Sequence, residues 1–197
     1  MTKNIIISVV LGILLGYFIV PESFIPLSEN LLIIGLSIIL FFVGIDLGME
    51  GTVIANFKKV GIRIIIFPIV VIIGTLVGVA ISSLFLSITL KESLMVGSGF
   101  GWYTMAPIMI STYSDEVSAI SFMHNVIREV LGLILVPIVA KKIGYIEAAS
   151  LPGAGVMDMC LPVVEKSTSP NTAVYAFTIG VVLSIGVPIL VQLFISI

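Results

Sequence analysis

Glu129 and Asp158 are carboxylates that stand in apolar surroundings. Glu129 lies in "HNVIREVLG", about a dozen residues from either end of the apolar run Val117–Ala140, which is about 18 Å at helical rise. Asp158 lies between two prolines in "LPGAGVMDMCLPVV". A charge at membrane depth costs about 2.5–3.5 kcal/mol on insertion scales, and such groups usually belong to substrate or proton pathways. Both carboxylates are therefore predicted to bind a cation or to carry a proton.

Other polar residues accompany the two carboxylates. Asn125 is one helical turn from Glu129 on the same predicted face, so it could contact the same ligand. Arg128 could hold an anionic group or act as a structural partner of Glu129, although adjacent helical residues point about 100° apart and rarely pair directly. Asp158 could also cap backbone N–H groups that the neighbouring prolines leave free. Asp46, in "FFVGIDLG", is either interfacial or faces the cavity.

The stretch "GSGFGWYTMAP" interrupts an uncharged segment with residues that make a poor helix. Gly99 and Gly101 would let the backbone approach a ligand closely. Trp102 and Tyr103 could be ordinary aromatics of a membrane interface. At the end of a loop that reaches into the membrane, they could instead offer a π face to a cation.

The composition restricts the class of protein. The 197 residues are 59% hydrophobic and 10% charged, with a mean hydropathy of +1.30, which is more apolar than a soluble domain of this size. The net charge of −2 gives no basic field for nucleic acid. The single cysteine cannot form an internal disulfide. We therefore expect one integral membrane domain, residues 1–197, without a metal site or a cofactor.

Charge placement then predicts how the chain crosses the membrane. A spanning helix needs about 20 residues, and the two runs that contain Gly and Pro are Leu94–Thr112 and Ser150–Val164. Basic loops stay cytoplasmic. The lysine pairs at 58–59 and 141–142 share one side only if Leu94–Thr112 enters and leaves the membrane from the outside. Lys142 and Lys166 share that side only if Ser150–Val164 enters and leaves from the inside. The full set of apolar runs is Asn4–Val20, Leu31–Gly48, Ile64–Ile88, Leu94–Thr112, Val117–Ala140, Ser150–Val164 and Thr172–Ser196.

The predicted fold is an all-α polytopic membrane protein. It has about five full transmembrane helices and two re-entrant segments of opposite orientation, with the N-terminus in the cytoplasm and the C-terminus outside. Interrupted segments that enter from opposite faces are typical of secondary transporters, whose substrate site lies between them. The alternative is seven spanning helices, two of them kinked.

Three blocks of the chain carry a family resemblance. In order and spacing, "SGFGWYTMAPIM", "FMHNVIREVLGLILVPIVAKK" and "LPGAGVMDMCLPVV" resemble the LysO lysine-exporter family of bacterial and archaeal inner membranes. The resemblance covers essentially the whole chain and implies export of L-lysine and its toxic analogues. It implies Glu129 and Asp158 as the functional carboxylates, whereas Asp46 fits the family pattern less firmly. Longer members carry an additional N-terminal membrane region, which implies a separate small membrane subunit or assembly with copies of this chain.

Energetics favour a proton-coupled mechanism. Exporting one positive charge against an inside-negative potential costs about 2.3 kcal/mol per 100 mV. A carboxylate that alternately holds a proton and an ammonium group cancels this charge, so we expect lysine/proton antiport and no enzymatic activity. Two alternatives remain: an accessory subunit of a split exporter without transport of its own, and an intramembrane protease built on Ser98 and His124.

Overall fold

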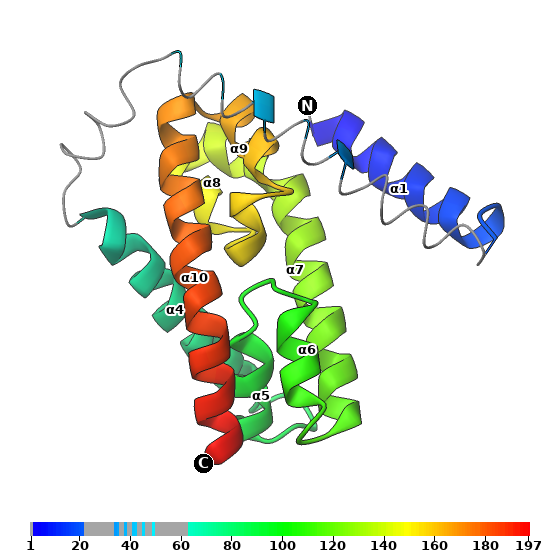
Figure 1. Cartoon of the computed structure of the whole chain (residues 1–197), viewed down its shortest axis with the longest axis vertical. Coiled ribbons are helices and arrows are strands. Elements are labelled where there is room, and N and C mark those ends of the chain that lie inside the picture. The colour runs from blue at the N-terminus through cyan, green and yellow to red at the C-terminus, as the bar shows by residue number, and fades with distance from the viewer. Residues whose placement is uncertain are drawn as a thin grey trace.

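The computed structural model describes residues 2–21, the separate positions 34, 35, 38, 41, 42, 45 and 49, and residues 63–197. This part of the chain is mainly helical. No strand occurs within these residues, so the predicted all-α class is confirmed (Figure 1). The helices are α1 (Thr2–Phe18), α4 (Arg63–Ser82), α5 (Leu90–Gly97), α6 (Met105–Ile110), α7 (Asp115–Lys142), α8 (Tyr145–Ser150), the 3-10 helix η2 (Gly153–Met157), α9 (Leu161–Ser167) and α10 (Pro170–Ser196).

Helices α4, α7 and α10 are the frame of the molecule. Over residues 65–82, 115–142 and 170–196 they are long and apolar enough to cross a membrane. Three of the predicted runs coincide with them, and α1 coincides with a fourth. The run Leu31–Gly48 lies outside the described residues apart from isolated positions, and Asp46 is not among those.

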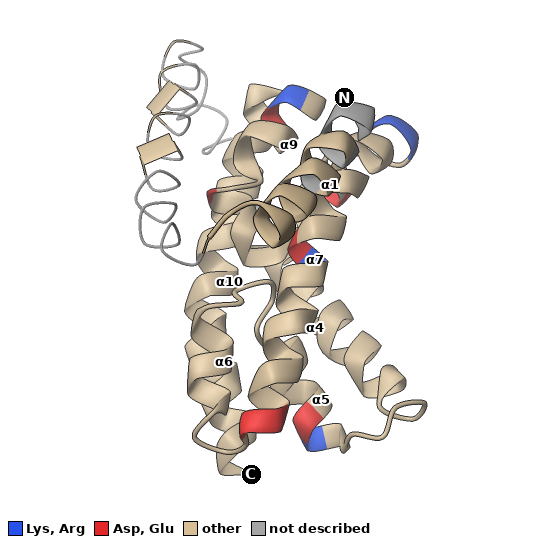
Figure 2. Cartoon of the chain, turned by 90° about the vertical axis from the view of Figure 1, so that its right-hand side faces the viewer, with Lys and Arg blue, Asp and Glu red and all other residues tan. Residues whose placement is uncertain are grey.

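The ends of α7 show why this helix starts and stops where it does. The Ser114 hydroxyl accepts a hydrogen bond from the Val117 N–H at 3.4 Å, which caps the first turn. Two acidic residues follow in that turn, and two lysines occupy the last turn, so both ends complement the helix dipole. Charged residues accordingly gather toward the two ends of the described bundle, with few between them (Figure 2).

The first interrupted run folds as two short helices joined by residues 98–104, here called the first tip. Helix α5 begins at a capping box made by Thr89 and Glu92. After the tip, α6 runs back toward the end of the bundle at which α5 began (Figure 1). The Lys91 ammonium group lies 4.8 Å from the Tyr113 ring centroid and donates to the Ile195 carbonyl at 3.2 Å. Both ends of this run therefore lie beside the C-terminal end of α10.

The second interrupted run folds in the same manner from the opposite end. Residues 151–160, here called the second tip, contain η2 and lie between α8 and α9. Gly132 of α7 and Gly180 of α10 make room for this tip. A Cβ on Gly132 would lie 2.9 Å from the Pro152 Cα, and a Cβ on Gly180 would lie 2.5 Å from the Met157 Cβ. The two tips approach each other midway along the bundle.

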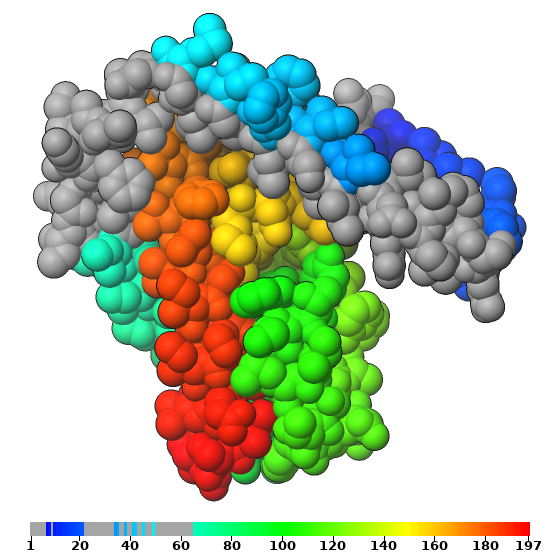
Figure 3. Space-filling model, in the orientation of Figure 1, coloured from blue at the N-terminus to red at the C-terminus, as the bar shows by residue number. Residues whose placement is uncertain are grey.

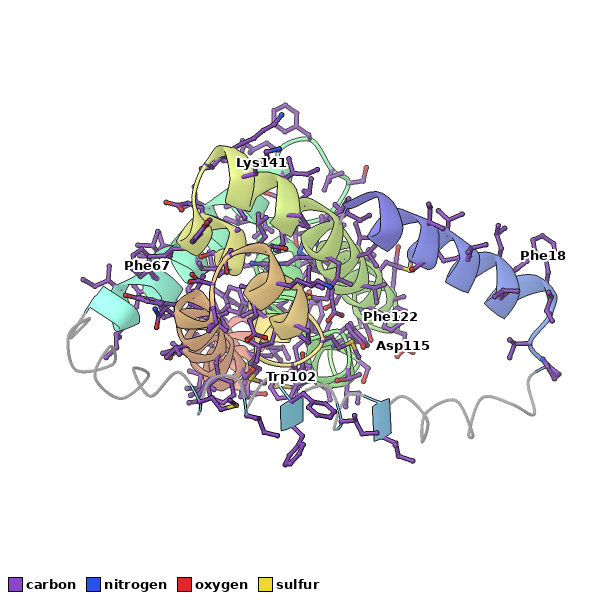
Figure 4. All side chains as sticks on the ribbon, turned by 90° about the horizontal axis from the view of Figure 1, so that it is seen from above. Phe18, Phe67, Trp102, Asp115, Phe122 and Lys141 are labelled. Atoms are coloured by element: carbon purple, nitrogen blue, oxygen red, sulfur yellow. The ribbon has the colours of Figure 1, made fainter. Side chains whose placement is uncertain are left out.

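The remaining views show the outside of this bundle. Helix α10 lies beside the part of the chain that holds α5 and α6 (Figure 3). Helix α1 extends away from the bundle, with Phe18 at its far end (Figure 4). The described side chains of α1 are exposed.

Candidate functional site

A cavity of about 240 Å³ lies where the two tips meet α7 and α10. The first tip gives it two aromatic rings and two hydroxyls, and the second tip gives it two thioethers and a carboxylate. Helix α7 contributes a second carboxylate from near its middle, and α10 contributes one serine. The lining residues are Gly101, Trp102, Tyr103, Thr104, Glu129, Ala154, Gly155, Met157, Asp158, Met159 and Ser184.

Backbone contacts between the two tips form one wall of the cavity. The Ala154 N–H donates to the Phe100 carbonyl at 2.7 Å. Phe100, Gly101 and Gly153 all have positive φ angles, of 45°, 95° and 76°. A Cβ on Gly101 would lie 2.6 Å from the Pro152 carbonyl oxygen. Gly101 and Gly153 are therefore needed for close contact between the tips, and Gly101 also lines the cavity.

Asn125 holds the first tip against α7. Its side chain is fully buried, and its Oδ1 accepts a hydrogen bond from the Gly101 N–H at 2.7 Å. Its amide nitrogen donates to the Ser121 carbonyl at 2.8 Å. Gly99 packs directly against the same amide. Asn125 and Gly99 lie behind the tip and outside the cavity lining, although the sequence placed both in the binding site.

Glu129 is the buried carboxylate of the cavity. Its residue is only 7% exposed, and its carboxylate packs on the second tip, so that a Cβ on Gly155 would lie 2.6 Å from Oε1. Within the described residues, no group donates a hydrogen bond to this carboxylate and no basic side chain pairs with it. A buried charge without a partner is costly, so the side chain is poised to take a cation or a proton.

Asp158 caps a backbone N–H group and also lines the cavity. It follows directly after η2, and its Oδ1 accepts a hydrogen bond from the N–H of Met159 at 2.6 Å. Its residue is half-buried, and it lines the same cavity as Glu129. One carboxylate oxygen thus caps the break in the helix, while the side chain still faces the cavity.

Arg128 points away from this site. Its Nε donates to the Leu151 carbonyl at 3.4 Å, and its Nη1 donates to the Thr75 hydroxyl at 3.3 Å. It lines a separate cavity, which it shares with His124. The structure therefore places Arg128 behind the second tip, where it neither pairs with Glu129 nor lines the carboxylate cavity.

The other residues of the cavity include both predicted and unpredicted ones. Trp102 and Tyr103 line the cavity. Sequence reasoning missed Ser184, Met157 and Met159, which also line it. A serine in the middle of the apolar helix α10 is a weak signal for such a site, since polar residues in spanning helices tend to face the protein interior. The two methionines are the neighbours of Asp158 in the sequence, so the prediction that Asp158 lies in the site could have been extended to them.

The geometry gives little support to catalysis or metal binding. The Ser98 hydroxyl donates to the Leu94 carbonyl at 2.6 Å, and no hydrogen bond joins it to His124. In the part of the chain that the structure describes, no three His, Cys, Asp or Glu residues group as metal ligands. What the cavity offers is two carboxylates, hydroxyls, aromatic faces and thioethers, which is a set suited to an organic cation.

Comparison with known proteins identifies the family. Residues 6–195 match the family model described as "Lysine exporter LysO". The chain is 28% identical over 197 residues, 98% of each chain, to a Haemophilus influenzae protein named "Putative lysine exporter". It is 29% identical over 160 residues to the Escherichia coli K12 protein named "Lysine exporter LysO", which covers 81% of this chain and 53% of that one, about half its length. No solved structure matches. The chain is a membrane protein that belongs to the lysine exporter LysO family, as its three sequence blocks predicted.

Proposed function

We propose that this protein is a secondary transporter that exports L-lysine and lysine analogues from the cytoplasm. The observation that carries the proposal is the cavity that Glu129 and Asp158 share at the junction of the two tips. Lysine brings two ammonium groups, and charge-assisted hydrogen bonds to carboxylates are the strongest contacts that such groups make. The names of both relatives support the same substrate.

We place the long helices across the inner membrane and propose that both interrupted runs re-enter it. The contacts of Lys91 with Tyr113 and Ile195 support this arrangement, because the first run begins and ends at one end of the bundle. With Lys141 and Lys142 in the cytoplasm, the second run opens to the cytoplasm and the C-terminus lies outside. This proposal corresponds to five spanning helices and two re-entrant segments.

Lysine and protons exchange at the carboxylates in the proposed mechanism. Glu129 has no protein partner among the described residues, so an ammonium group and a proton can alternate on it. Proton entry in exchange for lysine cancels the charge movement, which otherwise opposes export by about 2.3 kcal/mol per 100 mV. Asp158 holds the second ammonium group on the facing tip, and the two carboxylates together orient the substrate.

The α-carboxylate of lysine is assigned to neutral donors. The hydroxyls of Tyr103 and Ser184 have only thioether sulfurs as acceptors, at 3.9 Å and 3.8 Å, and sulfur is a weak acceptor. Both hydroxyls are free to turn toward a carboxylate in the cavity. Arg128 is not assigned this role, because its donors are directed to Leu151 and Thr75.

The first experiment is lysine/proton exchange in proteoliposomes that contain only this chain. Glu129→Gln keeps the shape but can neither pair with an ammonium group nor carry the exchanged proton, so exchange is expected to fall at least about 100-fold, more than the loss of one hydrogen bond to a charged group would cause. Glu116→Gln, at the exposed start of α7, is the matched control and is expected to leave exchange unchanged. Equal exchange by the parent and Glu129→Gln would remove Glu129 from the pathway.

A second candidate is an accessory subunit of a split exporter. It is favoured by the E. coli relative, of which this chain covers only 53%. In that case the chain needs copies of itself or a separate small membrane subunit for transport. The expected result is no exchange by the parent alone, and loss of assembly rather than loss of turnover in Glu129→Gln. Cross-linking in membranes measures the assembly directly.

A further inference from the structure

We infer that the same cavity accepts linear diamines, which carry an ammonium group at each end and no carboxylate. The inference rests on the proposed function, since it assigns a second class of substrate to that site. The diamine with the best fit is lysine without its carboxylate, a five-carbon chain with the same distance between its nitrogen atoms. Four features of the cavity carry this inference.

The first feature is the balance of charge. Glu129 and Asp158 supply two negative charges, and none of the described residues that line the cavity is basic. Lysine has a net charge of +1, because its own carboxylate offsets one ammonium group. A diamine has a charge of +2 and neutralises both carboxylates. Since an uncompensated buried charge is strongly unfavourable, the diamine satisfies this cavity more completely than lysine does.

The second feature is the burial of Glu129. The residue is 7% exposed, and its carboxylate accepts no hydrogen bond from any described residue. It lines the cavity, so its missing partner must come from the cavity. A ligand with a cationic group at each end can reach Glu129 with one end and Asp158 with the other.

The third feature is the use of the backbone N–H groups near the cavity. In the first tip, those of Gly101, Trp102 and Tyr103 already donate to protein oxygens at 2.7–3.1 Å. In the second tip, those of Asp158 and Met159 do so at 3.4 Å and 2.6 Å. A carboxylate is usually held by free N–H groups or by a basic side chain. No basic side chain of a described residue lines the cavity, so the carboxylate of lysine is left to neutral donors such as the Tyr103 hydroxyl and the serine hydroxyl of α10. Removal of the carboxylate therefore loses less than removal of an ammonium group that pairs with a carboxylate.

The fourth feature is the apolar part of the cavity lining. Met157, Met159 and Trp102 line the cavity beside the hydroxyls. Methionine is flexible and fits an aliphatic chain, and the Trp102 ring can pack on the methylene groups or face an ammonium group. The cavity thus matches a chain of methylene groups with a charge at each end.

Competition against labelled lysine exchange in proteoliposomes tests the inference. The five-carbon diamine is expected to inhibit at least as strongly as unlabelled lysine. The five-carbon monoamine is the matched control, and it is expected to inhibit about 10- to 100-fold more weakly, because it leaves one carboxylate unpaired. A diamine that inhibits no better than the monoamine, while unlabelled lysine competes, overturns the inference and leaves the proposed function intact.

Thermal unfolding of the purified protein separates the two ideas if lysine is not exchanged at all. The diamine is then expected to raise the melting temperature of the parent, and not that of Glu129→Gln or Asp158→Asn. The melting temperature of each variant without ligand shows whether that variant is folded. If the diamine fails to raise the melting temperature of the parent, the inference is overturned independently of transport.

Discussion

Arg128 and Glu129 are adjacent in the sequence, but their side chains face different cavities. Successive helical residues point about 100° apart, so Glu129 faces the carboxylate cavity while Arg128 reaches behind the second tip to Leu151 and Thr75. Asn125 acts in the same way on the first tip, through its hydrogen bond to Gly101. These geometries make Arg128 and Asn125 positioning residues, each of which holds one tip against α7.

Arg128→Lys distinguishes a positioning residue from one that binds the substrate carboxylate. The substituted side chain keeps the charge of Arg128 but lacks the planar guanidinium group that reaches Leu151 and Thr75 together. The exchange rate is expected to fall about tenfold, the equivalent of one lost hydrogen bond. Lysine and the diamine differ only in the carboxylate. If Arg128 does not contact that carboxylate, the substitution weakens inhibition by both equally, and the ratio of the two inhibition constants is expected to stay constant. A ratio that shifts toward the diamine would show that Arg128 contacts the substrate.

The contact between the two tips depends on glycine, and Gly101→Ala tests this dependence. Its φ of 95° and the 2.6 Å approach of a Cβ to the Pro152 oxygen predict a loss of about 1–3 kcal/mol in stability. Gly74→Ala in α4 is the control, because nothing lies within 4 Å of a Cβ there, and it is expected to be neutral or stabilising by up to about 1 kcal/mol. Thermal unfolding in detergent measures both. Equal melting temperatures for the parent and Gly101→Ala would contradict close packing of the tips.

Much of this arrangement of elements could be predicted from the sequence. The run predicted as Val117–Ala140 is observed as α7, Asp115–Lys142. The difference of two residues at each end arises because the helix includes the charged residues of its first and last turns, which the apolar run left out. The Gly and Pro residues in the sequence correctly indicated where the two helical interruptions, here called the tips, occur. That Asn125 contacts the first tip instead of the cavity could not be predicted, because this contact depends on where the tip packs against α7. Ser184 was missed because only tertiary contact brings α10 to the cavity.

At the scale of the whole molecule, the two proposed topologies predict different accessibility to thiol reagents. Cysteines at Ser87 and Thr112 flank the first interrupted run, and cysteines at Ile143 and Lys166 flank the second, all at exposed positions. If both runs re-enter the membrane, each pair reacts from a single face, and the two pairs react from opposite faces. If the chain spans the membrane seven times, the members of each pair react from opposite faces.

Labelling of intact cells with a membrane-impermeant maleimide makes this measurement. The expected result is reaction at Ser87→Cys and Thr112→Cys, and no reaction at Ile143→Cys and Lys166→Cys until the membrane is opened. The parent is its own control, because its single cysteine, Cys160, is fully buried. The result also bears on transport. If the two runs enter from opposite faces, one tip lies toward each side of the membrane, which suits alternating access to Glu129 and Asp158 at the site between them.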